Sequence, residues 1–224
     1  MRTSIQLLLL FALTGFLFAC GAPEGESVEA GDAVEDTDSA SAEAVTYTVD
    51  AENSVIQWTG SKPTGSTHNG IVKLQGGMLM VEDGQLVDGE FTVDMTSIED
   101  QDLTDPDKKG KLEGHLASDD FFAVEQFPTA KFVITGVTPA SEEGITHRIE
   151  GNLTMRDSTK SITIPANVAI SGGEISAVTP AFNIDRKKWN VMYNSSSMVD
   201  RAKDEFINDE INLVIDLKAT APSM

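Results

Sequence analysis

The feature that most constrains the fold is a two-residue alternation of apolar and polar side chains, which recurs from Val45 onward. In residues 162–170 the apolar side chains fall on even positions, and in residues 211–217 they fall on odd positions. Because successive side chains of a strand point to opposite faces, each segment has one dry face and one wet face. Antiparallel sheets with one buried side show this pattern, whereas buried parallel strands are continuously apolar. The sequence therefore predicts an all-β fold of antiparallel strands.

About eight such segments follow one another along the chain. Further alternating sets are Ile56/Trp58, Phe91/Val93/Met95, Ala130/Phe132/Ile134 and Ile149/Gly151/Leu153/Met155. Turn-forming pairs at residues 83–84, 88–89, 143–144 and 172–173 are expected to separate strands. Eight antiparallel strands can close into a barrel that is filled by side chains or holds one small ligand. We predict an eight-stranded antiparallel barrel with one or two short helices, the clearest at residues 105–122.

The N-terminus has a different composition and contains Cys20, the single cysteine of the chain. Arg2 precedes 14 mostly apolar residues, 5–18, a run shorter than the roughly 20 that a spanning helix needs. The ending Leu17-Phe18-Ala19-Cys20 resembles a bacterial lipobox, which implies cleavage before Cys20 and acylation of that residue. We therefore expect residues 1–19 to be a lipoprotein signal peptide and Cys20 to anchor the protein to a membrane of the cell envelope, on its periplasmic side or at the cell surface. A plain signal peptide with a chance cysteine is the alternative.

Residues 21–44 contain eight acidic residues and no lysine, arginine or aromatic residue. Such a segment buries too little apolar surface to offset the entropy of ordering, so residues 20–44 are predicted to form the lipidated cysteine and a disordered acidic tether. The folded domain is then expected to span residues 45–220. The whole chain has 36 acidic and 16 basic residues, a net charge of −20. This charge repels phosphate backbones, so nucleic acid is not an expected partner.

The chain lacks the common catalytic motifs. It has no Gly-x-Ser-x-Gly, no His-Glu-x-x-His and no phosphate-binding glycine loop. We therefore predict no catalytic residue, no cofactor and no metal site. A minority hypothesis is a metal-dependent enzyme in which His115, Asp119 and Asp120 lie on successive helical turns. The other two histidines, His68 and His147, are too scattered to indicate a metal site by spacing.

Several motifs occur in a fixed order along the folded part. They include Ser54-x-Ile56-x-Trp58, Gly114-His115-Leu116-x-Ser118-Asp119-Asp120-Phe121-Phe122, Phe127-Pro128-x-Ala130-x-Phe132, Gly151-Asn152-Leu153-Thr154-Met155 and Phe182-x-Ile184-x-Arg186. Together they resemble the YceI-like polyisoprenoid-binding family, over residues 45–219. The resemblance implies a lipocalin-like barrel whose hydrophobic interior takes the tail of an isoprenoid, a quinone or a similar long-chain lipid.

From the inward strand faces and this resemblance we predict a set of ligand-binding residues. They are Trp58, Phe91, Val93, Met95, Phe121, Phe122, Phe132, Ile134, Leu153, Met155, Phe182 and Arg186. Phe121 and Phe122 are expected near the mouth, and Arg186 either steadies a polar headgroup or forms a structural salt bridge. The expected function is that of an envelope lipoprotein that sequesters or transports an apolar lipid. The alternative is a non-catalytic structural or partner-binding barrel whose interior is filled by side chains.

Overall fold

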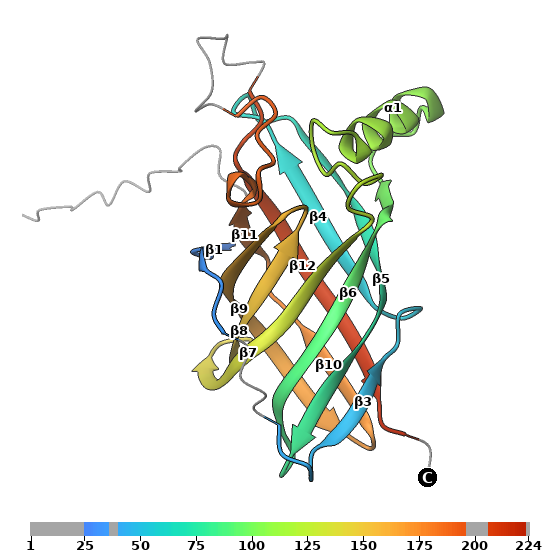
Figure 1. The fold of residues 1–224 in the computed structure, drawn as a ribbon. Coiled ribbons are helices and arrows are strands. Elements are labelled where there is room, and N and C mark those ends of the chain that lie inside the picture. Colours follow the sequence, from blue (N-terminus) through green and yellow to red (C-terminus); the bar gives the residue numbers. More distant parts are fainter. Residues whose placement is uncertain (1–24, 36–39, 196–205, 223–224) are drawn as a thin grey trace, which may run out of the picture.

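A computed structural model describes residues 25–35, 40–195 and 206–222, and most of them lie in strands of one closed but uneven sheet (Figure 1). The strands that form the ring are β4 (Val55–Ser61), β5 (Thr67–Glu82), β6 (Gln85–Asp100), β7 (Thr129–Glu142), β8 (Ile145–Met155), β9 (Ser158–Ser171), β10 (Glu174–Val178) and β12 (Glu210–Thr220). Each pairs antiparallel with the next, and β12 pairs with β4 to close the ring. The predicted all-β, lipocalin-like fold of about eight antiparallel strands is confirmed, and we refer to the closed sheet as the barrel.

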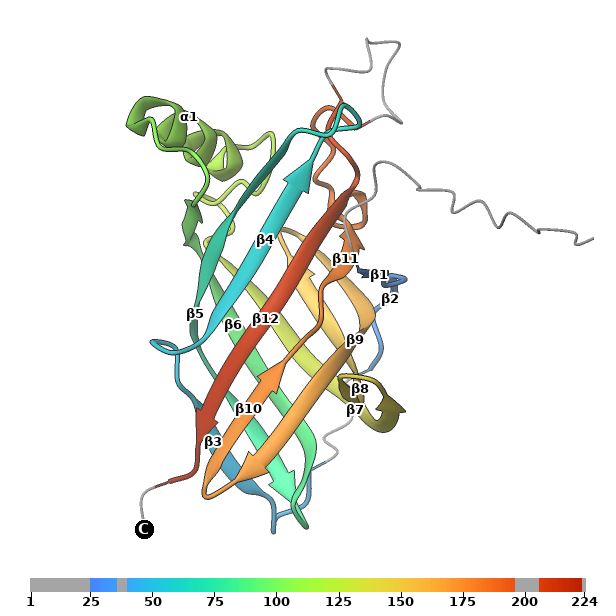
Figure 2. The ribbon, with the colours of Figure 1, turned by 180° about the vertical axis from the view of Figure 1, so that it is seen from behind.

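Two short strands make the barrel uneven. β3 (Val45–Val49) pairs with β5 and with the end of β12, so it continues the position of β4 toward one end. β11 (Phe182–Asp185) pairs with β12 beyond the point where β10 stops, and the 3₁₀ helix η1 (Arg186–Trp189) follows it. Figure 2 shows β10 and β11 one after the other beside β12. β10 pairs with β9 only at residues 167–171 of β9. The part of β9 that precedes Asn167, near β11, therefore has an edge that is not paired with β10.

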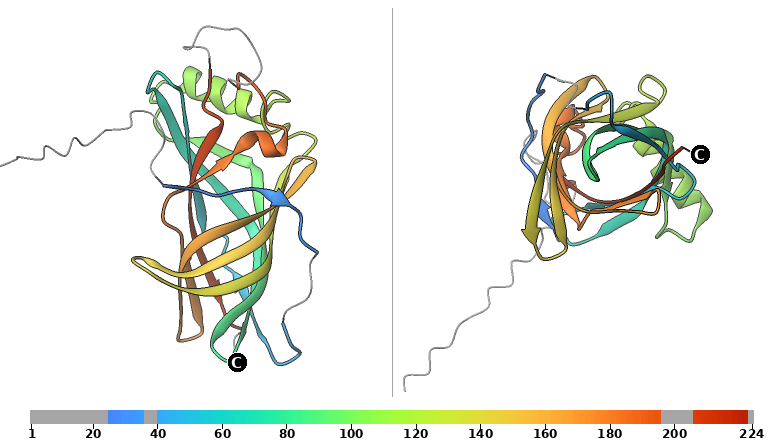
Figure 3. Two further views of the ribbon diagram at one scale, coloured as in Figure 1. Left: turned by 90° about the vertical axis from the view of Figure 1, so that its left-hand side faces the viewer. Right: turned by 90° about the horizontal axis from the view of Figure 1, so that it is seen from below.

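The segment of residues 25–35, which we call the strap, bridges the edge of β11 and the edge of β9. β1 (Glu26–Ser27) pairs in parallel with β11, and β2 (Gly31–Asp32) pairs antiparallel with β9. Val28, between them, is only 9% exposed and packs in the core. Figure 3 shows the strap crossing the outside of the barrel wall.

Side chains of β8 hold both ends of the strap. Arg148 donates to both carboxylate oxygens of Glu26, at 2.8 and 2.9 Å. The Asn152 amide accepts from the Val34 N–H at 2.9 Å and donates to the Val34 carbonyl at 2.7 Å. The prediction of a disordered tether is therefore wrong for residues 25–35. Composition measures only the apolar surface of the segment itself, whereas the unpaired sheet edges supply partners for its backbone. Cys20 and the predicted signal peptide lie outside the described residues.

The helix α1 (Pro106–Ala117) is shorter than the predicted residues 105–122. It begins where the Asp105 carboxylate accepts hydrogen bonds from the N–H groups of Asp107 and Lys108. It ends where the backbone N–H and the hydroxyl of Ser118 both bond to the His115 carbonyl. Phe121 and Phe122 consequently lie in the turns that follow the helix.

Three of the predicted turns join strands, and the fourth does not. Residues 83–84, 143–144 and 172–173 form hairpin turns. The predicted turn at residues 88–89 is wrong, because this pair lies inside β6 at a register shift. A β-bulge accommodates the same residue types as a turn, so the sequence alone does not separate the two.

The two ends of the barrel differ. α1, η1 and the loop between β4 and β5 lie at one end, which we call the helix end, and the end of β12 lies at the other (Figures 1 and 3). No helix in the described ranges has the length and apolar character needed to cross a membrane.

Candidate functional site

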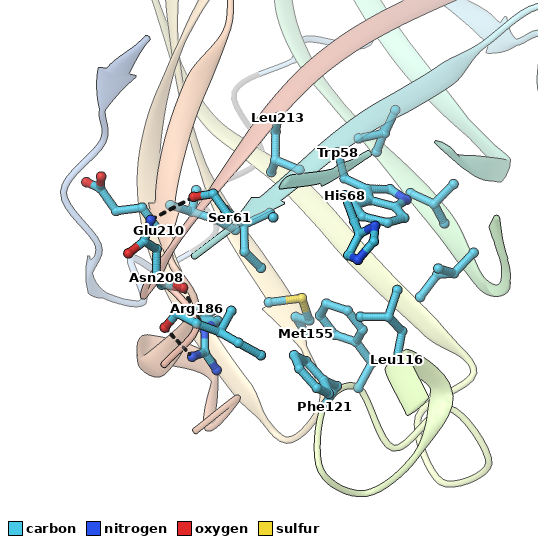
Figure 4. A pocket seen from close by; sticks show the side chains of 18 of the residues that line it. Trp58, Ser61, His68, Leu116, Phe121, Met155, Arg186, Asn208, Glu210 and Leu213 are labelled. Atoms are coloured by element: carbon cyan, nitrogen blue, oxygen red, sulfur yellow. Dashed lines mark hydrogen bonds between the residues drawn. The ribbon is translucent and has the colours of Figure 1, made fainter. Parts of the chain in front are cut away.

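An apolar cavity of about 210 Å³ lies inside the barrel at its helix end (Figure 4). Its walls are inward-facing apolar side chains of β4, β6, β8 and β12, joined by Leu112 and Leu116 of α1. Polar residues, among them Ser61, Lys62 and Asn208, also border it. The cavity thus offers an apolar chain a dry surface with polar groups at one side.

Eight of the twelve predicted ligand-binding residues line this cavity. They are Trp58, Val93, Met95, Phe121, Phe122, Leu153, Met155 and Arg186. The other four, Phe91, Phe132, Ile134 and Phe182, do not border the cavity but are buried in the core. The structure therefore brings eight of the predicted residues together at this cavity and places the other four in the core beside it.

Two of these core residues, Phe91 and Phe132, belong to a filled part of the barrel. Phe91 pairs with Phe132 across β6 and β7, two residues farther from the helix end than Val93 and Ala130, which line the cavity. The two phenylalanine rings stack with centroids 5.4 Å apart. The barrel is thus hollow at the helix end and packed with aromatic side chains below it.

Two glycines fix the aromatic side chains of this interior. A Cβ at Gly70 would clash with the indole of Trp58, whose ring N–H donates to the Ile71 carbonyl at 3.2 Å. A Cβ at Gly151 would likewise clash with the Phe132 ring. The missing side chains therefore make room for Trp58 in the cavity wall and for Phe132 in the packed part.

An aromatic cluster stands beside the cavity after α1. The His115 ring lies 5.0 Å from the Phe121 ring and 4.7 Å from the Tyr193 ring, and Phe121 lies 5.3 Å from Tyr193. The Phe121 carbonyl also accepts a 2.7 Å hydrogen bond from Arg156. These contacts join the turn after α1 to the segment after η1. The sequence indicated Phe121 but not Tyr193, which carries no recognisable motif.

Arg186 is 1% exposed, and its guanidinium binds backbone carbonyls. It donates to Asn208 at 3.1 Å, to Val191 at 2.8 Å and to Ile207 at 3.2 Å. Its Nη2 lies 3.6 Å from an Asp209 carboxylate oxygen. Burial lowers the pKa of Arg186, and the negative charge of Asp209 opposes this shift. Of the two predicted roles, these contacts favour the structural one, because the guanidinium holds the segments on either side of residues 196–205.

His68 lines the cavity, and the carboxylates of Asp100 and Asp102 lie beside its ring. Its Nδ1 lies 3.0 Å from an Asp102 oxygen and 4.0 Å from an Asp100 oxygen. Burial raises the pKa of the Asp100 carboxyl. Burial also acts to raise the pKa of Asp102, but the hydrogen bonds from the Asn69 N–H and from His68 outweigh it and lower that pKa. This cluster was missed because 32 residues separate His68 from Asp100 in the sequence, and only the β5–β6 pairing brings them together.

The structure does not assemble the trio of the minority metal hypothesis. His115 Nε2 lies 3.1 Å from Asp120, but Asp119 instead accepts a hydrogen bond from Gln126. Within the described ranges, the cluster of His68, Asp100 and Asp102 is the one group of three side chains whose spacing suits a metal ion.

The family model of the YceI-like domain matches residues 47–219 of this chain. The chain belongs to the YceI-like family. The strap precedes the residues that the YceI-like model matches.

Solved structures agree with the YceI-like fold. BcnA of Burkholderia cenocepacia is 22% identical, with a TM-score of 0.59 over 77% of this chain and 99% of that one. A polyisoprenoid-binding domain from Saccharophagus degradans is 14% identical, with a TM-score of 0.57 over 80% of this chain and 99% of that one. A comparison with proteins of curated function finds no match. Membership in this family of binding proteins supports lipid binding in general.

Proposed function

We propose that this protein is an envelope lipoprotein that holds the apolar tail of an isoprenoid, a quinone or a similar long-chain lipid in the barrel cavity, for sequestration or transport. The observation that carries the proposal is the apolar cavity at the helix end. Apolar surface transferred from water into such a cavity contributes about 25 cal/mol per Å². A small number of polar groups beside an apolar pocket is typical of sites that take a mostly hydrophobic ligand.

The cavity volume limits how much of the lipid is held. Apolar cavities of about 150 Å³ bind a molecule the size of benzene. A cavity of about 210 Å³ therefore accommodates one segment of a long tail, and the stacked rings of Phe91 and Phe132 stop it from going deeper. The remainder of a long chain leaves at the helix end.

The strap supports the lipoprotein part of the proposal. Gly25, at its start, accepts a hydrogen bond from the Asn183 amide, and Ser27 donates to Glu210, which borders the cavity. Four residues lie between Cys20 and Gly25, and the five residue-to-residue steps span at most about 18 Å when fully extended. An acylated Cys20 would therefore keep the cavity side of the barrel close to the bilayer that supplies or receives the lipid.

A lipid-uptake experiment with cavity-filling variants tests the proposal. Delipidated protein is incubated with a prenyl lipid or a quinone, and bound lipid is counted by native mass spectrometry. Ala130→Leu adds three carbon atoms inside the cavity, and we expect it to lower uptake at least tenfold. Ala177→Leu is the control, because Ala177 packs against the core without bordering the cavity.

The second candidate function is a non-catalytic structural or partner-binding barrel, which the packed layer of Phe91 and Phe132 favours. It replaces the first if gently purified protein carries no lipid and delipidated protein takes up none. Equal uptake by Ala130→Leu and Ala177→Leu would show that lipid binds elsewhere on the protein. The anchor is tested separately, by mass spectrometry of the N-terminal peptide from membrane-extracted protein, in which acyl chains on Cys20 are expected.

A further inference from the structure

Three side chains with metal-binding atoms meet at the edge of the cavity. His68 comes from the start of β5, Asp100 from the end of β6, and Asp102 lies two residues beyond. One ligand atom from each side chain lies within 4.8 Å of the others. Two of these atoms, His68 Nδ1 and Asp102 Oδ2, are 3.0 Å apart.

The Asp100 carboxylate is a second, independent observation that points to a cation. Its side chain is 0% exposed. One carboxylate oxygen accepts from the Leu103 N–H at 2.8 Å, but the other, Oδ2, has no hydrogen-bond partner among the described residues. Oδ2 is the oxygen that lies 4.0 Å from His68. Buried carboxylates are normally paired or coordinate a metal, so this oxygen calls for a cation.

The nearby lysine does not supply that cation. Lys109 forms its 2.9 Å ion pair with Glu99 and lies 3.8 Å from Glu113. Glu113 in turn accepts a 2.9 Å hydrogen bond from the Asp100 backbone N–H. Lys109 thus balances glutamates on the α1 side of the cluster, whereas Asp100 Oδ2 faces His68.

We propose that His68, Asp100 and Asp102 bind a divalent transition-metal ion of the zinc class. Zn²⁺ takes imidazole nitrogen and carboxylate oxygen at about 2.0–2.2 Å, so its ligand atoms lie roughly 3–3.5 Å from one another. The Asp102–His68 spacing already suits this geometry, and Asp100 Oδ2 needs to approach His68 by less than 1 Å. The His68 side chain is 46% exposed, so it has room to turn toward the ion.

The ligand set also indicates which ions bind weakly. Ca²⁺ and Mg²⁺ prefer sites made entirely of oxygen, and a set that includes an imidazole does not suit them. Among first-row ions, a site of this kind binds Zn²⁺ more tightly than Mn²⁺. Two carboxylates and a neutral imidazole balance the charge of one divalent ion. Since only three protein ligands are present, positions remain for water.

Zinc binding by the full-length protein without an affinity tag tests the site. Protein treated with chelator is titrated with Zn²⁺ in a calorimeter, and the dialysed product is checked by elemental analysis. We expect one Zn²⁺ per chain with a Kd on the order of 10 µM or tighter, and weaker binding of Ca²⁺ and Mg²⁺. His68→Ala and Asp102→Asn should each lower the affinity by about 100-fold or more, because each removes a ligand.

His115→Ala is the matched control. His115 also pairs with an aspartate, Asp120 at 3.1 Å, but the described residues give that pair no third ligand. Its removal should leave zinc affinity within about twofold. The proposal is overturned if the wild-type protein binds no stoichiometric zinc, if His68→Ala binds as tightly as wild type, or if His115→Ala loses as much affinity as His68→Ala. Circular dichroism confirms that each variant is folded, and the result does not depend on whether the cavity takes up lipid.

Discussion

Replacing Val28 by alanine should release the strap while the barrel stays folded. The Val28 side chain is 9% exposed and packs in the core between the two short strands of the strap. The substitution removes two buried methyl groups, which contribute about 0.8 kcal/mol each, or about 1.6 kcal/mol together. Because the strap lies outside the ring of strands, the lost free energy weakens the docking of the strap onto the barrel. A loss of 1.6 kcal/mol raises the undocked population by about 15-fold.

Limited proteolysis measures that population directly. Glu29 and Glu35 lie in the strap, so a glutamate-specific protease cuts there when the strap is undocked. The cleavage rate follows the open population when redocking is faster than cutting. We expect the rate to rise about 15-fold in Val28→Ala, with the urea midpoint of the barrel little changed.

Val34→Ala is the control on the same strap. Val34 is 42% exposed, so its truncation should change cleavage by less than about twofold. The Asn152 hydrogen bonds to the Val34 backbone remain in this variant. Equal cleavage of the two variants, or a parallel fall in the urea midpoint for Val28→Ala, would show that the strap does not dock as an independent unit.

Three further predictions concern the barrel itself. Arg186→Leu should lower the free energy of unfolding in urea by about 3–5 kcal/mol, because it leaves one buried carbonyl, two partly buried carbonyls and Asp209 without their partner. Phe132→Ala should cost about 3–5 kcal/mol in the same assay and increase lipid uptake in native mass spectra, because it extends the cavity into the packed layer. Burial lowers the pKa of His147 below that of a solvent-exposed histidine, so the unfolded state takes up the proton first as the pH falls. Stability should therefore decrease from pH 7 toward pH 5, and urea unfolding of His147→Gln should show a smaller decrease.

The alternating pattern predicted the fold because it records which face of each strand is dry. It does not record depth along the barrel axis. Phe91 and Val93 lie on the same face of β6, yet only Val93 borders the cavity, because Phe91 stacks on a ring from the neighbouring strand. The cluster at His68 was hidden for a similar reason, since the pairing of Gly70 with Asp100 depends on a register that contains bulges. The local sequence thus shows which side chains of a strand point inward. The position of the cavity and the cluster at His68 depend instead on how distant segments pair.

The strap changes what the acidic N-terminal segment can do. As a free coil, the 24 residues between Cys20 and Val45 would have an average end-to-end distance of about 25–30 Å, extended further by repulsion among the acidic side chains. With residues 25–35 docked, only four residues, spanning at most about 18 Å, lie between Cys20 and the strap on the barrel wall. The bonds of Arg148 and Asn152 thus determine how far the barrel stands from any anchor at Cys20. Since β11 carries both the strap and the cavity-lining Ile184, a docked strap holds the cavity end, rather than the end of β12, nearest that anchor. Under the proposed function, undocking the strap would therefore slow lipid exchange with the bilayer even if the affinity of the cavity were unchanged.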